Sequence, residues 1–165
     1  MNVVSNASPL ITLARLDSLY LLSGLFSTVF IAREVYEEIV VEGQGMPGAS
    51  AVAGAHWIKV LDISNPSSML SIGRRFSLGA GETSAVILAQ ELGIDLVLMD
   101  ERRGRRMATQ MGLAVIGCVG LLEVLYRRGD LSDLRSSYRE LVDQGIRIDR
   151  RTLDASLRRH ELPPL

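Results

Sequence analysis

The chain has one cysteine, Cys118, and two histidines, His56 and His160. A single cysteine cannot form an intramolecular disulfide, and so few soft ligands exclude a cysteine-rich or histidine-rich zinc site. Lysine is equally scarce: Lys59 is the only one, so almost every basic side chain is an arginine. Carboxylates therefore remain as the main side chains from which site chemistry could be built.

Long apolar runs and excess charge of one sign are also missing. No segment approaches the roughly 20 apolar residues that span a bilayer. The N-terminal segment does not have the form of a signal peptide, because Asn6, Pro9 and Arg15 interrupt its apolar stretch. The net charge of -1 gives no global basic field, so nucleic-acid binding would require a local patch. We expect a cytoplasmic protein with no membrane partner.

What the chain does have is the composition of one folded domain. Its 165 residues are 47% hydrophobic and 22% charged, which excludes a disordered or low-complexity chain. Short apolar runs rich in β-branched residues alternate with helical patterns, which predicts a mostly parallel sheet. The predicted strands cover residues 3–4, 28–31, 57–61, 95–99 and 113–116. We therefore predict an α/β fold with a single domain over residues 1–165.

Helix signals fill the intervals between these strands. Ser8 before Pro9 is a helix-start signal, and Gly93 is placed to end a helix that begins near Glu82. The Ser-rich segment 64–68 reads as a turn. The remaining predicted helices lie near residues 8–16, 18–25, 34–40, 102–111, 121–127, 131–144 and 151–159.

Two polar residues directly follow predicted strands, Asn6 after the first and Asp100 after the fourth. In parallel sheets, sites gather at the carboxyl ends of strands, where the strand order changes direction. The carboxylate of Asp100 is therefore expected at that edge. Asp100 could equally cap the helix that follows it, and the two roles are compatible.

Glu82 and Glu38 are weaker candidates on local pattern alone. Glu82 begins a helix after two glycines, Gly79 and Gly81, which would let another group approach the backbone. An acid at a helix start is also a common stabilising placement. Glu38 lies on a helix with Glu34 on the same face, and most such glutamates simply form the solvated side.

The densest charge cluster is the arginine run formed by Arg102, Arg103, Arg105 and Arg106. Guanidinium groups suit bidentate contact with phosphate, so this run is a candidate RNA-binding segment beside Asp100. The alternative is an ordinary solvated helix face, paired with Glu101 and neighbouring acids.

With these residues placed, the chain resembles the PIN-domain superfamily, in particular the short prokaryotic PIN-like proteins related to VapC toxins. The resemblance covers nearly the full length. It rests on the segments VVSNASPLITLARL, VFIAREVYEEIV, LGAGETSAVILAQELG, LVLMDERRGRRMATQMGLAVIG and GLLEVLYRRG in this order. It implies a three-layer α/β/α fold with a central, mostly parallel sheet of about four to five strands. Residues from about 120 to 165 would form a C-terminal helical extension.

The resemblance also implies a site. It places Asn6, Glu38, Glu82 and Asp100 at the positions of the acidic cluster, with Ser8 at a small hydroxyl position and Glu101 in support. Such a cluster would hold Mg²⁺ or Mn²⁺, which prefer carboxylate oxygens. Asn6 stands where typical PIN nucleases carry their first aspartate, so one negative charge is missing.

Two functions follow from the resemblance. The first is a metal-dependent endoribonuclease of the VapC toxin type, in which Asp100, Glu82 and Glu38 act through a metal-activated water. Its partners would be an RNA substrate, a cognate antitoxin and a second copy of the chain, with the apolar segment Leu10 to Leu25 as a candidate contact surface. The second is a catalytically impaired PIN-like module that binds RNA or protein, because Asn6 replaces the aspartate.

Overall fold

The computed structural model describes residues 1–165, which divide into two compact units. The first unit, Met1–Gly117, contains every strand, and the second, Cys118–Leu165, is built from helices alone.

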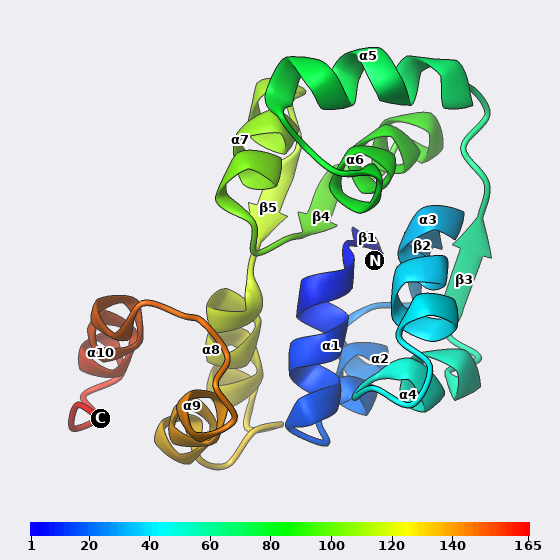
Figure 1. Ribbon diagram of the computed structural model, residues 1–165. Helices are drawn as coiled ribbons and strands as arrows, with labels where there is room; N and C mark the ends of the chain where they lie inside the picture. Colours follow the sequence, from blue (N-terminus) through cyan, green and yellow to red (C-terminus); the bar gives the residue numbers. More distant parts are fainter. The chain divides into compact units, whose positions relative to one another are not determined.

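A five-stranded parallel sheet forms the centre of the first unit (Figure 1). Its strands are β1 (Asn2–Ser5), β2 (Thr28–Ala32), β3 (Ile58–Leu61), β4 (Leu96–Leu98) and β5 (Ala114–Ile116). Their order across the sheet is β3-β2-β1-β4-β5, and every neighbouring pair is parallel. Helices flank this sheet in the three-layer α/β/α arrangement, so the predicted fold class is confirmed.

Helices connect each strand to the next. They are α1 (Ala7–Arg15), the 3₁₀ turn η1 (Leu19–Leu21), α2 (Leu22–Leu25), α3 (Arg33–Tyr36), the π-helical η2 (Glu37–Glu42), α4 (Ala49–Gly54), α5 (Pro66–Phe76), α6 (Ala80–Leu92) and α7 (Arg102–Gln110). Helix α6 is the central one, because it packs along β1, β2 and β4. Its side chains from Thr83 to Ala89 are all buried, so an amphipathic pattern is absent from this helix.

Three local predictions were wrong. Helix α1 begins at Ala7 with Asn6 as its N-cap residue, so Ser8 lies inside the first turn and caps nothing. Segment 64–68 is not only a turn, because Pro66 begins the helix α5. The expected single helix over 34–40 is a short α-helical turn followed by a π-helical turn.

The apolar segment from Leu10 to Leu25 is mostly core. Leu10, Leu13 and Leu22 are fully buried, and Leu19 is 5% exposed. This burial supports the ordinary-core interpretation of the segment over that of a contact surface.

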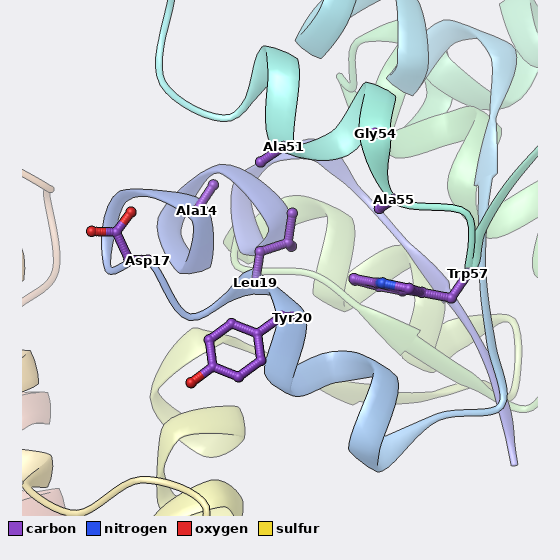
Figure 2. Close-up of a pocket in the computed structure, with 8 residues that line it drawn as sticks. All are labelled: Ala14, Asp17, Leu19, Tyr20, Ala51, Gly54, Ala55 and Trp57. Carbon is purple, nitrogen blue, oxygen red and sulfur yellow. The ribbon is translucent and has the colours of Figure 1, made fainter.

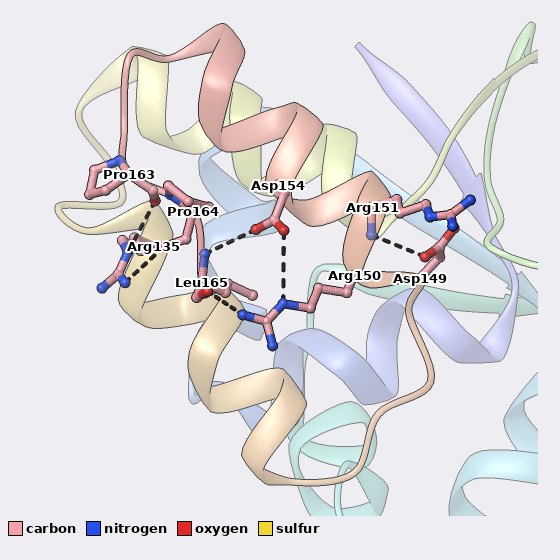
Figure 3. Close-up of polar contacts among 8 residues, drawn as sticks. All are labelled: Arg135, Asp149, Arg150, Arg151, Asp154, Pro163, Pro164 and Leu165. Atoms are coloured by element: carbon pink, nitrogen blue, oxygen red, sulfur yellow. Dashed lines mark hydrogen bonds and ion pairs between the residues drawn. The ribbon is translucent and has the colours of Figure 1, made fainter.

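The second unit comprises α8 (Cys118–Arg128), α9 (Leu134–Asp143) and α10 (Arg150–Arg159). Asp133 caps α9 by accepting from the Ser136 backbone N–H at 2.9 Å, and Asp149 caps α10 in the same way. After α10 the chain returns along these helices, as Figure 3 shows. There Arg135 donates to the carbonyl oxygens of Pro163 and Pro164, and Asp154 accepts from the Leu165 N–H.

A polar chain crosses the interior of this helical unit. The Ser156 hydroxyl donates to Glu123 Oε1 at 2.5 Å, so its single proton is committed, and the Tyr138 hydroxyl must donate to Ser156 at 2.7 Å. Burial raises the pKa of Tyr138 to about 12. Arg159 completes the chain with an ion pair to Glu123 at 2.7 Å.

No helix of either unit combines the length and apolar character required for crossing a membrane.

Candidate active site at the carboxyl edge of the sheet

The strand order changes direction between β1 and β4. From β1 the chain proceeds to β2 and β3 on one side, and then returns to β4 and β5 on the other. Val4 and Ser5 pair with Val97 and Leu98, and the Asn6 N–H donates to the Leu98 carbonyl at 2.9 Å. Asn6 and Asp100 therefore follow adjacent strands at the switch point, where open α/β sheets bind their ligands.

Asn6 carries an unsatisfied polar atom at this point. The residue is 3% exposed, and its Oδ1 has no hydrogen-bond partner. An unpaired buried carbonyl oxygen loses about 1–3 kcal/mol of hydration without compensation, so such atoms in folded proteins call for an explanation. A ligand that accepts an oxygen donor would supply one.

Glu38 approaches the same place from the π-helical turn η2. A Cβ built on Gly81 would lie 2.7 Å from Glu38 Oε2 and 3.4 Å from Asn6 Oδ1. Gly81 therefore faces both oxygens, and the missing side chain leaves them room. This confirms the expectation that a glycine at this turn lets another group approach the backbone. π-Helical turns are rare and often occur at functional sites.

The Glu38 carboxyl is electrostatically unfavourable where it stands. Much of the side chain remains accessible, but partial burial against the start of α6 raises its pKa, and the negative charge of Glu82 raises it further. Glu42 contributes in the same direction. Glu82 lies in the first turn of α6, with Oε2 3.0 Å from a Cβ built on Gly79. A bound cation would stabilise the charged form of Glu38, which burial and the nearby Glu82 charge disfavour.

Asp100 lies at the end of β4, half-buried. Its Oδ1 is 2.7 Å from a Cβ built on Gly117, and Arg105 Nη1 is 2.8 Å from the same point. Arg105 donates to the Met99 carbonyl at 3.0 Å. The N-cap residue of α7 is Glu101, not Asp100, and its side chain makes no capping hydrogen bond.

The structure brings these candidates to one edge without closing them into a single acidic cluster. No group of three or more aspartate, glutamate, histidine or cysteine side chains is arranged to hold a metal ion. The charge of Glu82 acts on Glu38, the Asn6 amide oxygen lies with Glu38 at Gly81, and Asp100 lies just past the end of the neighbouring strand. Ser8 is half-buried in the first turn of α1, and Glu101 is exposed.

These oxygens nevertheless suit a hard divalent cation. Such ions bind carboxylate and amide oxygens, and the unsatisfied Asn6 Oδ1 and the raised pKa of Glu38 are both relieved by a positive charge. The room beside Gly81 is where a side chain would otherwise fill the site. The donor set therefore fits, with one charge fewer than a set of four carboxylates.

The arginine run begins two residues after Asp100. Arg102, Arg103 and Arg106 are exposed on α7 and form no ion pair, so the pairing with Glu101 and nearby acids that the alternative interpretation requires is absent. Gly104 separates the two arginine pairs because a Cβ there would collide with the buried Met99 sulfur. The glycine in the run thus serves the packing of α7 onto the strand end.

A hollow of about 290 Å³ lies elsewhere in the first unit (Figure 2). Its walls come from α1, the turn that follows it, and α4, with Trp57 beside the amino end of β3. The lining residues are Ala14, Asp17, Leu19, Tyr20, Ala51, Gly54, Ala55 and Trp57. None of the candidate site residues lines it, so it is separate from the carboxyl edge.

The fold and this edge define a nuclease-type α/β protein. The chain belongs to the PIN-domain family, because a family model described as a PIN domain matches residues 2–162. PIN domains generally use divalent metal ions and act on RNA, which agrees with the oxygen-rich edge described above. No curated protein matches the sequence significantly.

Proposed function

We propose that this protein is a divalent-metal-dependent endoribonuclease whose site lies at the carboxyl edge of the sheet. The observation that carries the proposal is the convergence on Gly81 of a buried, unsatisfied amide oxygen and a carboxyl group with a raised pKa. Both are unfavourable in the protein alone, and both become favourable beside a cation. Perturbed pKa values and unsatisfied buried polar atoms often mark functional sites.

In this proposal Glu38 and Glu82 hold Mg²⁺ or Mn²⁺, and the Asn6 amide oxygen completes the set on the buried side. When bound, the ion supplies a water of lowered pKa and neutralises charge on the scissile phosphate. Asp100 takes part from the neighbouring strand, through water or directly, and accepts a proton from the attacking water. Ser8 and Glu101 orient water at the margin of the site.

The test is cleavage of single-stranded RNA by the purified full chain with Mn²⁺ or Mg²⁺ and with EDTA. Asp100→Ala and Glu82→Gln should each lower the cleavage rate at least about 100-fold, which is the usual contribution of general acid–base catalysis. Cleavage that persists unchanged in both variants would come from a contaminant and would reject the site.

A second candidate function rests on Asn6. An amide in place of a carboxylate weakens the hold on a hard cation, so the chain could be a PIN-domain module that binds RNA or protein without efficient cleavage. RNA binding without cleavage, together with no measurable Mn²⁺ affinity by calorimetry, would favour this function.

The resemblance to VapC toxins supports finer proposals about partners. On that basis the protein is a cytoplasmic toxin that pairs with a cognate antitoxin and forms a homodimer. A small gene beside this one that encodes a DNA-binding pattern, and co-purification of its product with this chain, would test the pairing. Light scattering of the purified chain measures its oligomeric state.

A further inference from the structure

We propose that arginines from α5 and α7 form one surface strip that binds the phosphate backbone of single-stranded RNA next to the site. The strip, called here the α5–α7 arginine strip, consists of Arg74, Arg75, Arg102, Arg103 and Arg106. The choice of RNA as partner rests on the proposed function. The contribution of α5 is new, because segment 64–68 alone predicts a turn and gives Arg74 and Arg75 no structural position.

The C-terminal end of α5, which carries Arg74 and Arg75, lies beside α7 (Figure 1). Helices α5 and α7 are in contact, and Arg103 Nη1 reaches the Ser77 carbonyl, just past the end of α5, at 3.5 Å. The chain then passes from Ser77 to Gly79 and into the first turn of α6, which carries Glu82. The strip thus borders the acidic edge of the sheet.

None of the five arginines is neutralised. All are exposed, and none takes part in any of the ion pairs of the protein. Neither helix contains an aspartate or a glutamate, so no counter-charge comes from their own sequences. Arg75 lies over the ring of Phe76, with 5.4 Å between the guanidinium carbon and the ring centre, which limits its freedom before a ligand arrives.

The two arginines in the first turn of α7 do not stabilise that helix. Arg102 and Arg103 occupy its first turn, where no acid is present and the helix dipole disfavours positive charge. Five exposed guanidinium groups without ion pairs, on two helices in contact in a protein with a net charge of -1, instead indicate an anionic partner. Planar guanidinium groups suit phosphate oxygens, and contacts to phosphate position a nucleic acid without reading its sequence.

Arg105 is excluded from the strip. It is half-buried and its guanidinium donates to the Met99 carbonyl, so it holds the end of β4 beside Asp100. The arginine run therefore divides into one positioning residue and three residues that face solvent. Sequence alone treats these four as equivalent.

The test is RNA binding in EDTA, where no cleavage occurs, measured by fluorescence anisotropy with a labelled oligouridine and the full chain at several salt concentrations. For single strands, log K falls with log salt by about 0.7 for each phosphate neutralised. Arg74→Gln combined with Arg75→Gln should reduce this slope by about 1.4. The double variant Arg102→Gln with Arg106→Gln should do the same.

The matched control is Arg139→Gln combined with Arg158→Gln, which removes two exposed, unpaired arginines from the helical unit. It should leave the slope unchanged. No RNA binding by the wild type, an unchanged slope in the α5 variant, or an equal loss in the control would overturn the strip. Displacement of RNA by polyglutamate as readily as by polyuridine would assign the strip to an acidic protein instead.

These outcomes are separable from those of the ribonuclease proposal. Salt-dependent binding through the strip without cleavage would reject the nuclease and keep the strip. If Asp100→Ala abolishes cleavage but the Arg74→Gln, Arg75→Gln variant binds RNA as the wild type does, the ribonuclease proposal stands and the strip is rejected.

Discussion

Glu38 Oε2 lies 2.7 Å from the position that a Cβ on Gly81 would occupy. The Glu38 carboxylate therefore fits against the start of α6 only because residue 81 has no side chain. The three nearest heavy atoms to that position belong to the side-chain ends of Glu38 and Asn6, so a methyl group there would displace these side chains while the backbone stays in place.

Gly81→Ala should therefore weaken metal binding at the site without destabilising the fold. Alanine favours the helix by about 1 kcal/mol over glycine. This gain offsets the cost of displacing the Glu38 carboxylate, so the free energy of unfolding should change little. Mn²⁺ affinity should fall about 10- to 100-fold, the range found when groups that orient metal ligands are disturbed. Calorimetric titration with Mn²⁺ and a thermal melt measure the two effects. Gly54→Ala, where a Cβ meets nothing within 4 Å, is the matched control.

Glu38→Gln should stabilise the metal-free protein at neutral pH. The pKa of Glu38 is raised in the folded state, so its contribution to stability is present below the unfolded value and is lost as pH rises through the folded one. The variant escapes that loss, with a gain of no more than about 1 kcal/mol because solvent screens the accessible carboxylate. Denaturant unfolding in EDTA at pH 4 and pH 7.5 measures it, and a variant less stable than wild type at pH 7.5 contradicts the assignment.

Asn6→Asp should destabilise the metal-free protein, which is the opposite of the effect expected for Glu38→Gln. A third carboxylate beside Glu38 and Glu82 increases repulsion in EDTA, so the melting temperature should fall there. With Mn²⁺ present the added charge should raise affinity at least about tenfold, which corresponds to about 1.4 kcal/mol. Equal melting temperatures for variant and wild type in both conditions would show that Asn6 Oδ1 does not face the cation site.

Gly104→Ala tests the packing of α7. A Cβ at residue 104 would overlap the sulfur of Met99, which is fully buried and cannot move to solvent. Overpacking of this kind destabilises by about 1–3 kcal/mol. Denaturant unfolding measures the loss, and the losses of Gly104→Ala and Met99→Ala should be less than additive in the double variant, because the second change removes the clash. Full stability of Gly104→Ala alone would contradict the packing described.

Ser156→Ala tests the polar chain of the helical unit. The change leaves the fully buried Tyr138 hydroxyl without its acceptor and removes a donor from Glu123, so a loss of about 1–3 kcal/mol is expected. Tyr138→Phe removes the stranded hydroxyl, so the double variant should be more stable than Ser156→Ala alone. Thermal unfolding of the three variants decides this, and independent, additive losses would contradict a connected chain.

The sequence was enough to predict the parallel sheet, because short continuous apolar runs such as Leu96 to Met99, alternating with helical patterns, are typical of strands covered on both faces. It was not enough for α5. Asn65 and Pro66 begin a turn and a helix equally well, and the serines that follow favour the turn on local grounds. The preference for the helix comes from packing against α6, which no local pattern records.

The acidic positions at the site could be proposed from the sequence, but not their relationships. Nothing local to Glu38 distinguishes it from Glu37 or Glu42, and only the π-helical turn and the proximity of Gly81 do so. The burial of Asn6 Oδ1 without a partner is likewise a property of the assembled edge. Long-range packing, which periodicity does not encode, determines both.

Every candidate acid and every arginine of the strip lies within the first unit, Met1–Gly117. The helical unit contributes no candidate acid and no arginine of the strip. Its own buried polar groups, Tyr138, Ser156 and Glu123, bond to one another. Mutations could therefore accumulate in the last third of the chain while the chemistry proposed for the sheet is inherited unchanged. Selection could act on the two parts at different rates.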